Sequence, residues 1–312
     1  MTSFAVVFPG QGSQSVGMLD VFGDHPAVRR TLAEASDALG EDVGALIHAG
    51  PKEQLDLTTN TQPVMLTAGV ACWRALQAET GLTPAAVAGH SLGEYAALVA
   101  AGALSLADAL PLVRFRAQAM QEAVPAGAGA MAAILGLDAD AVVAGCADAA
   151  AATGEVVAAA NFNDPKQTVI AGTKAAVDRA CELLKARGAK RALPLAVSAP
   201  FHCPLMRPAA ERLRERLAGV ALAAPTIAVL NNVDVASPVD PAAIADALYR
   251  QAYQPVRWVE LVRALRARGV THVVECGPGK VLAGLTKRID AELIGAAVYD
   301  PPSLAEAKGL LQ

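Results

Sequence analysis

The pentad Gly-His-Ser-Leu-Gly at residues 89–93 leaves the backbone few choices. A Gly-x-Ser-x-Gly sequence fits a sharp turn from a strand into a helix, because side chains at either glycine would collide with those elements. The apolar run ending at Ala88 predicts the strand, and the Ala- and Leu-rich stretch 94–101 predicts a buried helix. Such a turn exposes Ser91 as a nucleophile, which indicates acyl chemistry. A serine in a tight apolar turn can also be purely structural, so partners are needed elsewhere in the chain.

Short apolar runs separated by helical stretches predict the fold class. They occupy residues 4–8, 87–89, 226–230 and 270–275. This alternation predicts an α/β fold with a mostly parallel sheet covered by helices. Between about 129 and 197 the order changes to strand, helix, strand, strand, helix, strand, which is typical of a ferredoxin-like unit. We therefore expect a parallel-sheet catalytic domain formed by residues 1–127 and 198–312, with a ferredoxin-like βαββαβ domain inserted at residues 128–197.

Composition limits the kinds of partner that we expect and the cellular compartment in which we expect the protein. The net charge of −4 gives no support for nucleic acid as a partner, and the inserted unit lacks the paired aromatics that stack RNA bases. Although 54% of the residues are hydrophobic, the uncharged stretches are interrupted, which argues against a membrane span. Five scattered cysteines fit neither a disulfide framework nor a zinc site, so we expect no bound metal. No basic region precedes a hydrophobic one at the start, and we expect a cytoplasmic monomer.

A serine nucleophile needs a base, and the chain has five histidines. Two lie in polar segments near the start, and another opens a predicted buried strand, where a structural imidazole is the usual role. His90 adjoins Ser91, but neighbouring side chains at a sharp turn point apart. His202 lies in the proline-bracketed segment 198–204, where a rigid loop can aim an imidazole. On this ground His202 is the favoured base.

A second glycine-rich stretch, residues 8–14, follows the first predicted strand. It would expose backbone amides at the same sheet edge as the serine turn. An oxyanion hole needs two such amides, and we expect them from Leu92, directly after the nucleophile, and from Gln11. A dinucleotide-binding loop is the rival interpretation, but the glycines at 10, 12 and 17 depart from Gly-x-Gly-x-x-Gly spacing.

Arg114 and Arg116 lie in the mostly apolar segment 110–120. An arginine on the exposed face of an amphipathic helix is the ordinary explanation. A buried arginine that faces a cleft would instead hold a carboxylate through a bidentate fork. These residues alone leave both possibilities open.

Taken together, these stretches resemble the malonyl-CoA:acyl carrier protein transacylase family. The matching features, in order from about residue 4 to 290, are Phe-Pro-Gly-Gln-Gly-Ser-Gln at 8–14, Gly-His-Ser-Leu-Gly-Glu at 89–94, Arg116, Asn-Phe-Asn at 161–163, Pro-Phe-His at 200–202, Gln251 and Glu-Cys-Gly-Pro-Gly at 275–279. The resemblance implies an α/β-hydrolase-like large domain and a ping-pong transfer of malonyl from coenzyme A to the phosphopantetheine thiol of acyl carrier protein. It implies no cofactor beyond these two substrates.

The resemblance also implies a role for individual residues. Ser91 would be the nucleophile and His202 its base and later acid, with the amides of Gln11 and Leu92 as the oxyanion hole. Arg116 would hold the malonyl carboxylate. The backbone carbonyl of Gln251 would orient the imidazole in place of an aspartate, which fits the lack of an acidic motif near the histidine.

Three further residues carry supporting expectations. Asn161 would support the serine corner, although a turn-forming asparagine is an equally fair interpretation. His90 belongs to the same corner. The Phe201 ring would fill the space that an α-methyl group needs and so disfavour methylmalonyl-CoA, or it simply packs under the corner.

Three functional classes stay open at this level. They are the transacylase, a serine thioesterase or esterase acting on short acyl-CoA, and a catalytically silent module that binds a carrier protein. The silent module is the least favoured, because no member of the Ser-His pair is missing. The hydrolase differs from the transacylase in whether the acyl-serine is lost to water without a thiol acceptor. Within the transacylase class we favour fatty-acid synthesis over polyketide loading.

Overall fold

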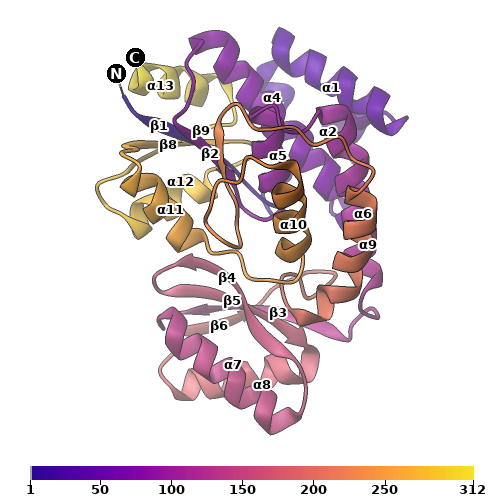
Figure 1. Ribbon diagram of the computed structural model, residues 1–312, viewed down its shortest axis with the longest axis vertical. Coiled ribbons are helices and arrows are strands. Elements are labelled where there is room, and N and C mark those ends of the chain that lie inside the picture. Colours follow the sequence, from indigo (N-terminus) through magenta and orange to yellow (C-terminus); the bar gives the residue numbers. More distant parts are fainter. Residues whose placement is uncertain (1) are drawn as a thin grey trace.

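Five parallel strands form the central sheet of the large domain in the computed structural model, which describes residues 2–312 (Figure 1). In spatial order they are β7 (Ala228–Leu230), β2 (Ala86–Gly89), β1 (Phe4–Phe8), β8 (His272–Cys276) and β9 (Ile294–Val298). Every neighbouring pair is parallel. The four strands expected from the sequence are all present in this sheet, and β9 is an additional strand at its edge.

Helices bury both faces of this sheet. Phe4, Val6 and Phe8 of β1 pack into one apolar core, whereas Ala5 and Val7 pack into a second, because successive side chains of a strand point to opposite faces. The helices of the large domain are α1 (Pro26–Leu39), α2 (Val43–Ala49), α3 (Lys52–Leu55), α4 (Thr58–Thr80), α5 (Gly93–Ala100), α6 (Leu106–Glu122), α9 (Arg207–Leu217), α10 (Pro241–Gln251), α11 (Trp258–Ala267), α12 (Val281–Ile289) and α13 (Pro301–Leu311), with short 3-10 turns at Asp20–Phe22 and Pro204–Met206. Between residues 2 and 312, no helix has the length and apolar character needed to traverse a bilayer.

The small domain is a four-stranded antiparallel sheet with two helices on one face (Figure 1). Its elements are β3 (Gly129–Leu135), α7 (Ala139–Thr153), β4 (Val157–Asp164), β5 (Gln167–Thr173), α8 (Lys174–Ala186) and β6 (Arg191–Pro194). The spatial order β4-β5-β3-β6 is the ferredoxin-like arrangement expected from the sequence. The β4–β5 turn is tight, because β4 continues to Asp164, which still pairs with Gln167.

The two faces of the small sheet have different partners. Ala132, Ile134 and Ile170 pack with α7 and α8. Met131 and Val169 point the other way, toward the large domain, and join its main core. The small domain thereby contributes one wall of the space between the domains.

Among the contacts that join the domains, two involve a close approach of the backbone. Val256, in the large domain, pairs with β4: its amide donates to the carbonyl of Ala160 (2.9 Å) and its carbonyl accepts from the amide of Phe162 (2.9 Å). The second contact is where the chain enters and leaves the small sheet, since a Cβ on Gly129 would lie 2.4 Å from the ring of Pro200. Only a glycine fits at this crossing, which lies two residues before His202.

Candidate active site

The serine turn is built as its sequence predicts. β2 ends at Gly89 and α5 begins at Gly93. A Cβ on Gly89 would lie 1.8 Å from the carbonyl carbon of Gly93, and one on Gly93 would lie 2.1 Å from the carbonyl oxygen of Phe8. Between these glycines Ser91 has a φ of 53°, a left-handed conformation that is rare outside glycine. The close packing therefore forces the sharp turn and presents the serine hydroxyl beyond the end of the strand.

His202 is the histidine that meets Ser91. Its Nε2 lies 2.6 Å from the Oγ of Ser91, and its Nδ1 lies 2.8 Å from the backbone carbonyl oxygen of Gln251. A carbonyl can only accept, so Nδ1 carries the proton and Nε2 is left as the acceptor for the serine proton. The carbonyl fixes the reactive tautomer, as a carboxylate does in a triad.

Burial keeps the His202 imidazole neutral. The side chain is 3% exposed, and burial together with the positive charge of Arg116 lowers the pKa of His202 to about 3. The folded-state pKa lies below the unfolded value, so the unfolded chain binds more protons at intermediate pH. The resulting contribution to stability is present above about pH 6.5 and is lost as the pH falls toward the folded pKa.

We expect the His202 ring to stay unprotonated from pH 8 down to about pH 5. The check is an NMR titration of protein with ¹⁵N-labelled imidazole rings, with the His202 signals assigned by their loss in His202→Ala. Ring nitrogen shifts that stay constant over this range would agree with the buried neutral base. A titration midpoint near pH 6.5 would show that water reaches the ring.

Arg116 is buried beside the serine and is 2% exposed. Its Nη2 donates to the Oγ of Ser91 (3.2 Å) and to Oε1 of Gln251 (3.0 Å), and its Nη1 donates to Oε1 of Gln62 (2.8 Å). Among residues 2–312 it has no carboxylate within ion-pair distance. Arg114, by contrast, pairs with Glu41 at the surface. The two arginines thus have different surroundings, and a guanidinium with no carboxylate within ion-pair distance among the described residues faces the hydroxyl of Ser91.

The glycine-rich loop after β1 lies against the serine turn. A Cβ on Gly10 would be 3.0 Å from the carbonyl oxygen of His90, so only glycine permits this approach without displacement. The backbone amides of Gln11 and Leu92 donate to no acceptor within the described part of the chain. Two free amides beside the hydroxyl of Ser91 have the arrangement that an oxyanion hole would require.

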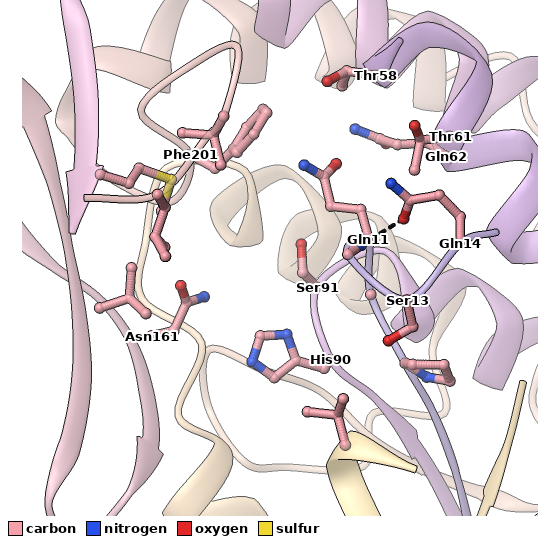
Figure 2. A pocket seen from close by; sticks show the side chains of 18 of the residues that line it. Gln11, Ser13, Gln14, Thr58, Thr61, Gln62, His90, Ser91, Asn161 and Phe201 are labelled. Atoms are coloured by element: carbon pink, nitrogen blue, oxygen red, sulfur yellow. Dashed lines mark hydrogen bonds between the residues drawn. The ribbon is translucent and has the colours of Figure 1, made fainter. Parts of the chain in front are cut away.

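A cavity of about 760 Å³ opens over Ser91 between the two domains. Figure 2 shows the serine near its centre, with Gln11 beside it and Gln62 projecting from α4. Phe201, which is 7% exposed, and Asn161 of β4 lie on the side formed by the small domain and the exit loop. Leu195, Ala196, Val197, Val281, Leu282 and Leu285 are also among the residues that line the cavity.

A sequence comparison identifies the family to which this site belongs. Residues 5–292 match the sequence model of the acyl transferase domain. The chain belongs to the acyl transferase family. The malonyl CoA-acyl carrier protein transacylase of Salmonella typhimurium is 55% identical over 308 residues, which cover 98% of this acyltransferase and 99% of the relative.

Comparison with solved structures also finds malonyl transferases similar to this acyltransferase. The acyl-carrier-protein S-malonyltransferase of Burkholderia pseudomallei superposes with a TM-score of 0.97 at 66% identity, covering 99% of this chain and 100% of the other. A malonyl-transacylase solved in complex with a type II polyketide acyl carrier protein superposes with a TM-score of 0.96 at 51% identity over 99% and 100% of the two chains. The fold class expected from the sequence is confirmed.

One support of the serine corner differs from the sequence-based expectation. In this acyltransferase the corner is held by Asn232, whose Oδ1 accepts from the amide of Ser91 (2.7 Å) and whose Nδ2 donates to the carbonyl of Gly89 (2.6 Å). The side chain of Asn161 makes no hydrogen bond to the corner within residues 2–312. It lies on β4 across the cavity, because that strand pairs with Val256.

The sequence motifs also do not predict the contacts that His90 makes around the corner. The Nε2 of His90 lies 2.8 Å from Oδ1 of Asn163, and its ring packs on Trp258 at a centroid distance of 5.5 Å. His90 therefore anchors the turn to Asn163 of the small domain. Within residues 2–312 no three His, Cys, Asp or Glu side chains converge as a metal site would require.

Proposed function

We propose that this acyltransferase moves a malonyl group from malonyl-CoA to the phosphopantetheine thiol of acyl carrier protein through a malonyl-serine intermediate. The observation that carries the proposal is the buried guanidinium of Arg116, 3.2 Å from the hydroxyl of Ser91 and without a carboxylate partner among the described residues. A buried cation is costly unless something neutralises it. A substrate that brings its own carboxylate would do so.

In the first half-reaction, the Oγ of Ser91 attacks the thioester carbonyl carbon while its proton passes to Nε2 of His202. The resulting oxyanion is held by the amides of Gln11 and Leu92. Collapse of the tetrahedral intermediate breaks the carbon–sulfur bond, and the coenzyme A thiolate takes the proton from the imidazole. The products are free coenzyme A and malonyl-Ser91.

The second half-reaction runs the same steps in reverse with a different thiol. The pantetheine thiol of the carrier gives its proton to Nε2 of His202 and attacks the ester carbonyl. Ser91 then leaves, with its proton returned by the imidazole. Each step uses groups of this chain and of the two substrates, so the proposed route calls for no cofactor.

The comparisons support both substrates. The relatives named above are malonyl transferases, and one of the solved complexes holds an acyl carrier protein. We favour fatty-acid synthesis as the pathway. The proposal keeps the expectations of a cytoplasmic monomer that binds neither nucleic acid nor membrane.

The test follows the malonyl group by intact mass. The pure protein is mixed with malonyl-CoA, its mass is measured, and holo acyl carrier protein is then added. A malonyl adduct that is stable in buffer and moves to the carrier would agree with the proposal. An adduct that is lost to water without transfer would favour the thioesterase, and no adduct would contradict both.

Phe201 supplies a prediction on substrate choice. Its ring lines the cavity beside Ser91, so we expect it to occupy space that an α-methyl group needs. A methyl group in a pocket is worth about 1 to 3 kcal/mol. Phe201→Ser should therefore reduce the malonyl over methylmalonyl ratio of kcat/KM by roughly 10- to 200-fold. Competition between the two CoA esters, read by mass spectrometry of the carrier, checks this. An unaltered ratio would show that the ring serves only to pack the corner.

A further inference from the structure

Glu94 is a buried carboxylate in the first turn of α5, directly beneath the serine turn. It is 2% exposed and has no cation within ion-pair distance among residues 2–312. Burial raises the pKa of the Glu94 carboxyl to about 7, so an acid here is costly and calls for a reason. The steps proposed for the reaction leave Glu94 without a role.

The contacts of Glu94 lead to both halves of the reactive pair. Its Oε2 accepts from the backbone amide of Asn232 (2.9 Å) and from Nε2 of Gln251 (2.9 Å). Asn232 in turn clamps the serine turn through its side chain, at the amide of Ser91 and the carbonyl of Gly89. One carboxylate oxygen therefore fixes the residue that holds the nucleophile in its strained conformation.

Gln251, which makes the second contact with Glu94, also bonds three other groups of the site. Its Nε2 also donates to the carbonyl of Ser91 (2.9 Å), its Oε1 accepts from Arg116, and its backbone carbonyl accepts from His202. An ionised carboxylate can only accept, so in this form Glu94 makes the amide group of Gln251 turn its nitrogen toward Glu94 and its oxygen toward the arginine. With the opposite orientation, an N–H of Gln251 would face the donors of Arg116.

We propose that Glu94 is a positioning residue for malonyl transfer, acting as the shared hydrogen-bond acceptor that aligns Asn232 and Gln251, and through them Ser91, His202 and Arg116. This rests on the proposed function, since it assumes that Ser91 and His202 carry the acyl transfer. In its ionised form, above about pH 7, Glu94 accepts bonds that are shorter and stronger than neutral ones, which suits a group on which two supports depend. Glu94 itself touches no substrate atom in this scheme.

The experiment compares Glu94→Ala, which removes the acceptor, with Glu94→Gln, which keeps an acceptor oxygen of the same reach. Single-turnover formation of malonyl-serine and the steady-state kcat and KM are measured with the full chain. Glu94→Ala should slow acylation by about 10²-fold, the size expected of a misplaced reactive group. KM for malonyl-CoA should change by less than about threefold, because Gln62 still holds Arg116. Glu94→Gln should recover most of the rate.

A second pair of variants keeps the test decisive if Glu94→Ala fails to fold. Asn232→Ala should slow acylation, whereas Asn231→Ala should not, because the Asn231 side chain caps Asp234 (2.7 Å) and does not reach the serine turn. Thermal unfolding of each variant separates lost stability from lost alignment. Acylation at the wild-type rate in Glu94→Ala or in Asn232→Ala, equal losses in Glu94→Gln and Glu94→Ala, or a change confined to KM would overturn the proposal. A wild-type protein that forms no malonyl-serine would instead overturn the proposed function.

Discussion

Ser91→Ala is expected to abolish the malonyl adduct and to lower the rate of transfer by at least about 10⁴-fold. The reason is that the described site offers no second hydroxyl 2.6 Å from Nε2 of His202. Removing the Oγ leaves the imidazole without a group to deprotonate. Intact mass after mixing with malonyl-CoA, followed by the carrier assay, measures both effects.

The matched control is Ser198→Ala. Ser198 also lines the cavity, but its hydroxyl is 2.7 Å from that of Thr58 and has no contact with the histidine. This variant should form the adduct at close to the wild-type rate. A malonyl adduct on Ser91→Ala protein would show that another residue is the nucleophile.

Arg116→Ala is expected to remove the preference for malonyl-CoA. Losing one partner of a desolvated charge pair costs about 2 to 5 kcal/mol, which is roughly 30- to 5000-fold in kcat/KM. Acetyl-CoA has no carboxylate, so its kcat/KM should fall less and its use relative to malonyl-CoA should rise. Parallel kinetics with both thioesters give the ratio.

Arg114→Ala is the control for this change, because it removes an arginine of the same helix that pairs with Glu41 outside the cavity. Its selectivity should equal that of the wild type. Equal losses with malonyl-CoA and acetyl-CoA in Arg116→Ala would mean that the guanidinium only holds Ser91 and Gln251 in place. Unchanged selectivity would contradict its assignment as the carboxylate-binding residue.

The fold could be predicted from sequence where burial dictates the residue types. β1 is a continuous apolar run at 4–8 because both of its faces are covered, and its bounds agree with the structure. β9, with the sequence Ile-Gly-Ala-Ala-Val, lies at the sheet edge with its first residues exposed, so it lacks that signal. β7 begins at Ala228, later than expected, because Thr226 uses its hydroxyl and amide to bond the carbonyl of Ala101.

The site could be predicted where its chemistry is local in sequence. The glycines around Ser91 and those after β1 mark tight turns, and such turns leave a pattern that can be read directly. No sequence pattern marks Asn232, because it lies 141 residues from Ser91 along the chain. It reaches the serine turn only through the pairing of β7 with β2. Glu94 is part of a recognisable motif, yet its role depends on the same long-range contact.

The crossing of Gly129 and Pro200 has a consequence for how acceptor choice can diverge among related chains. Ser91 lies in the large domain and His202 lies in the corner just past that crossing, whereas one wall of the cavity comes from the strands of the small domain. Substitutions at Met131, Val169 or Leu195, which line this wall, would therefore change the shape of the cavity without changing Ser91 or His202. The Ser91–His202 pair and the cavity wall that a substrate thiol must pass could therefore change independently during evolution.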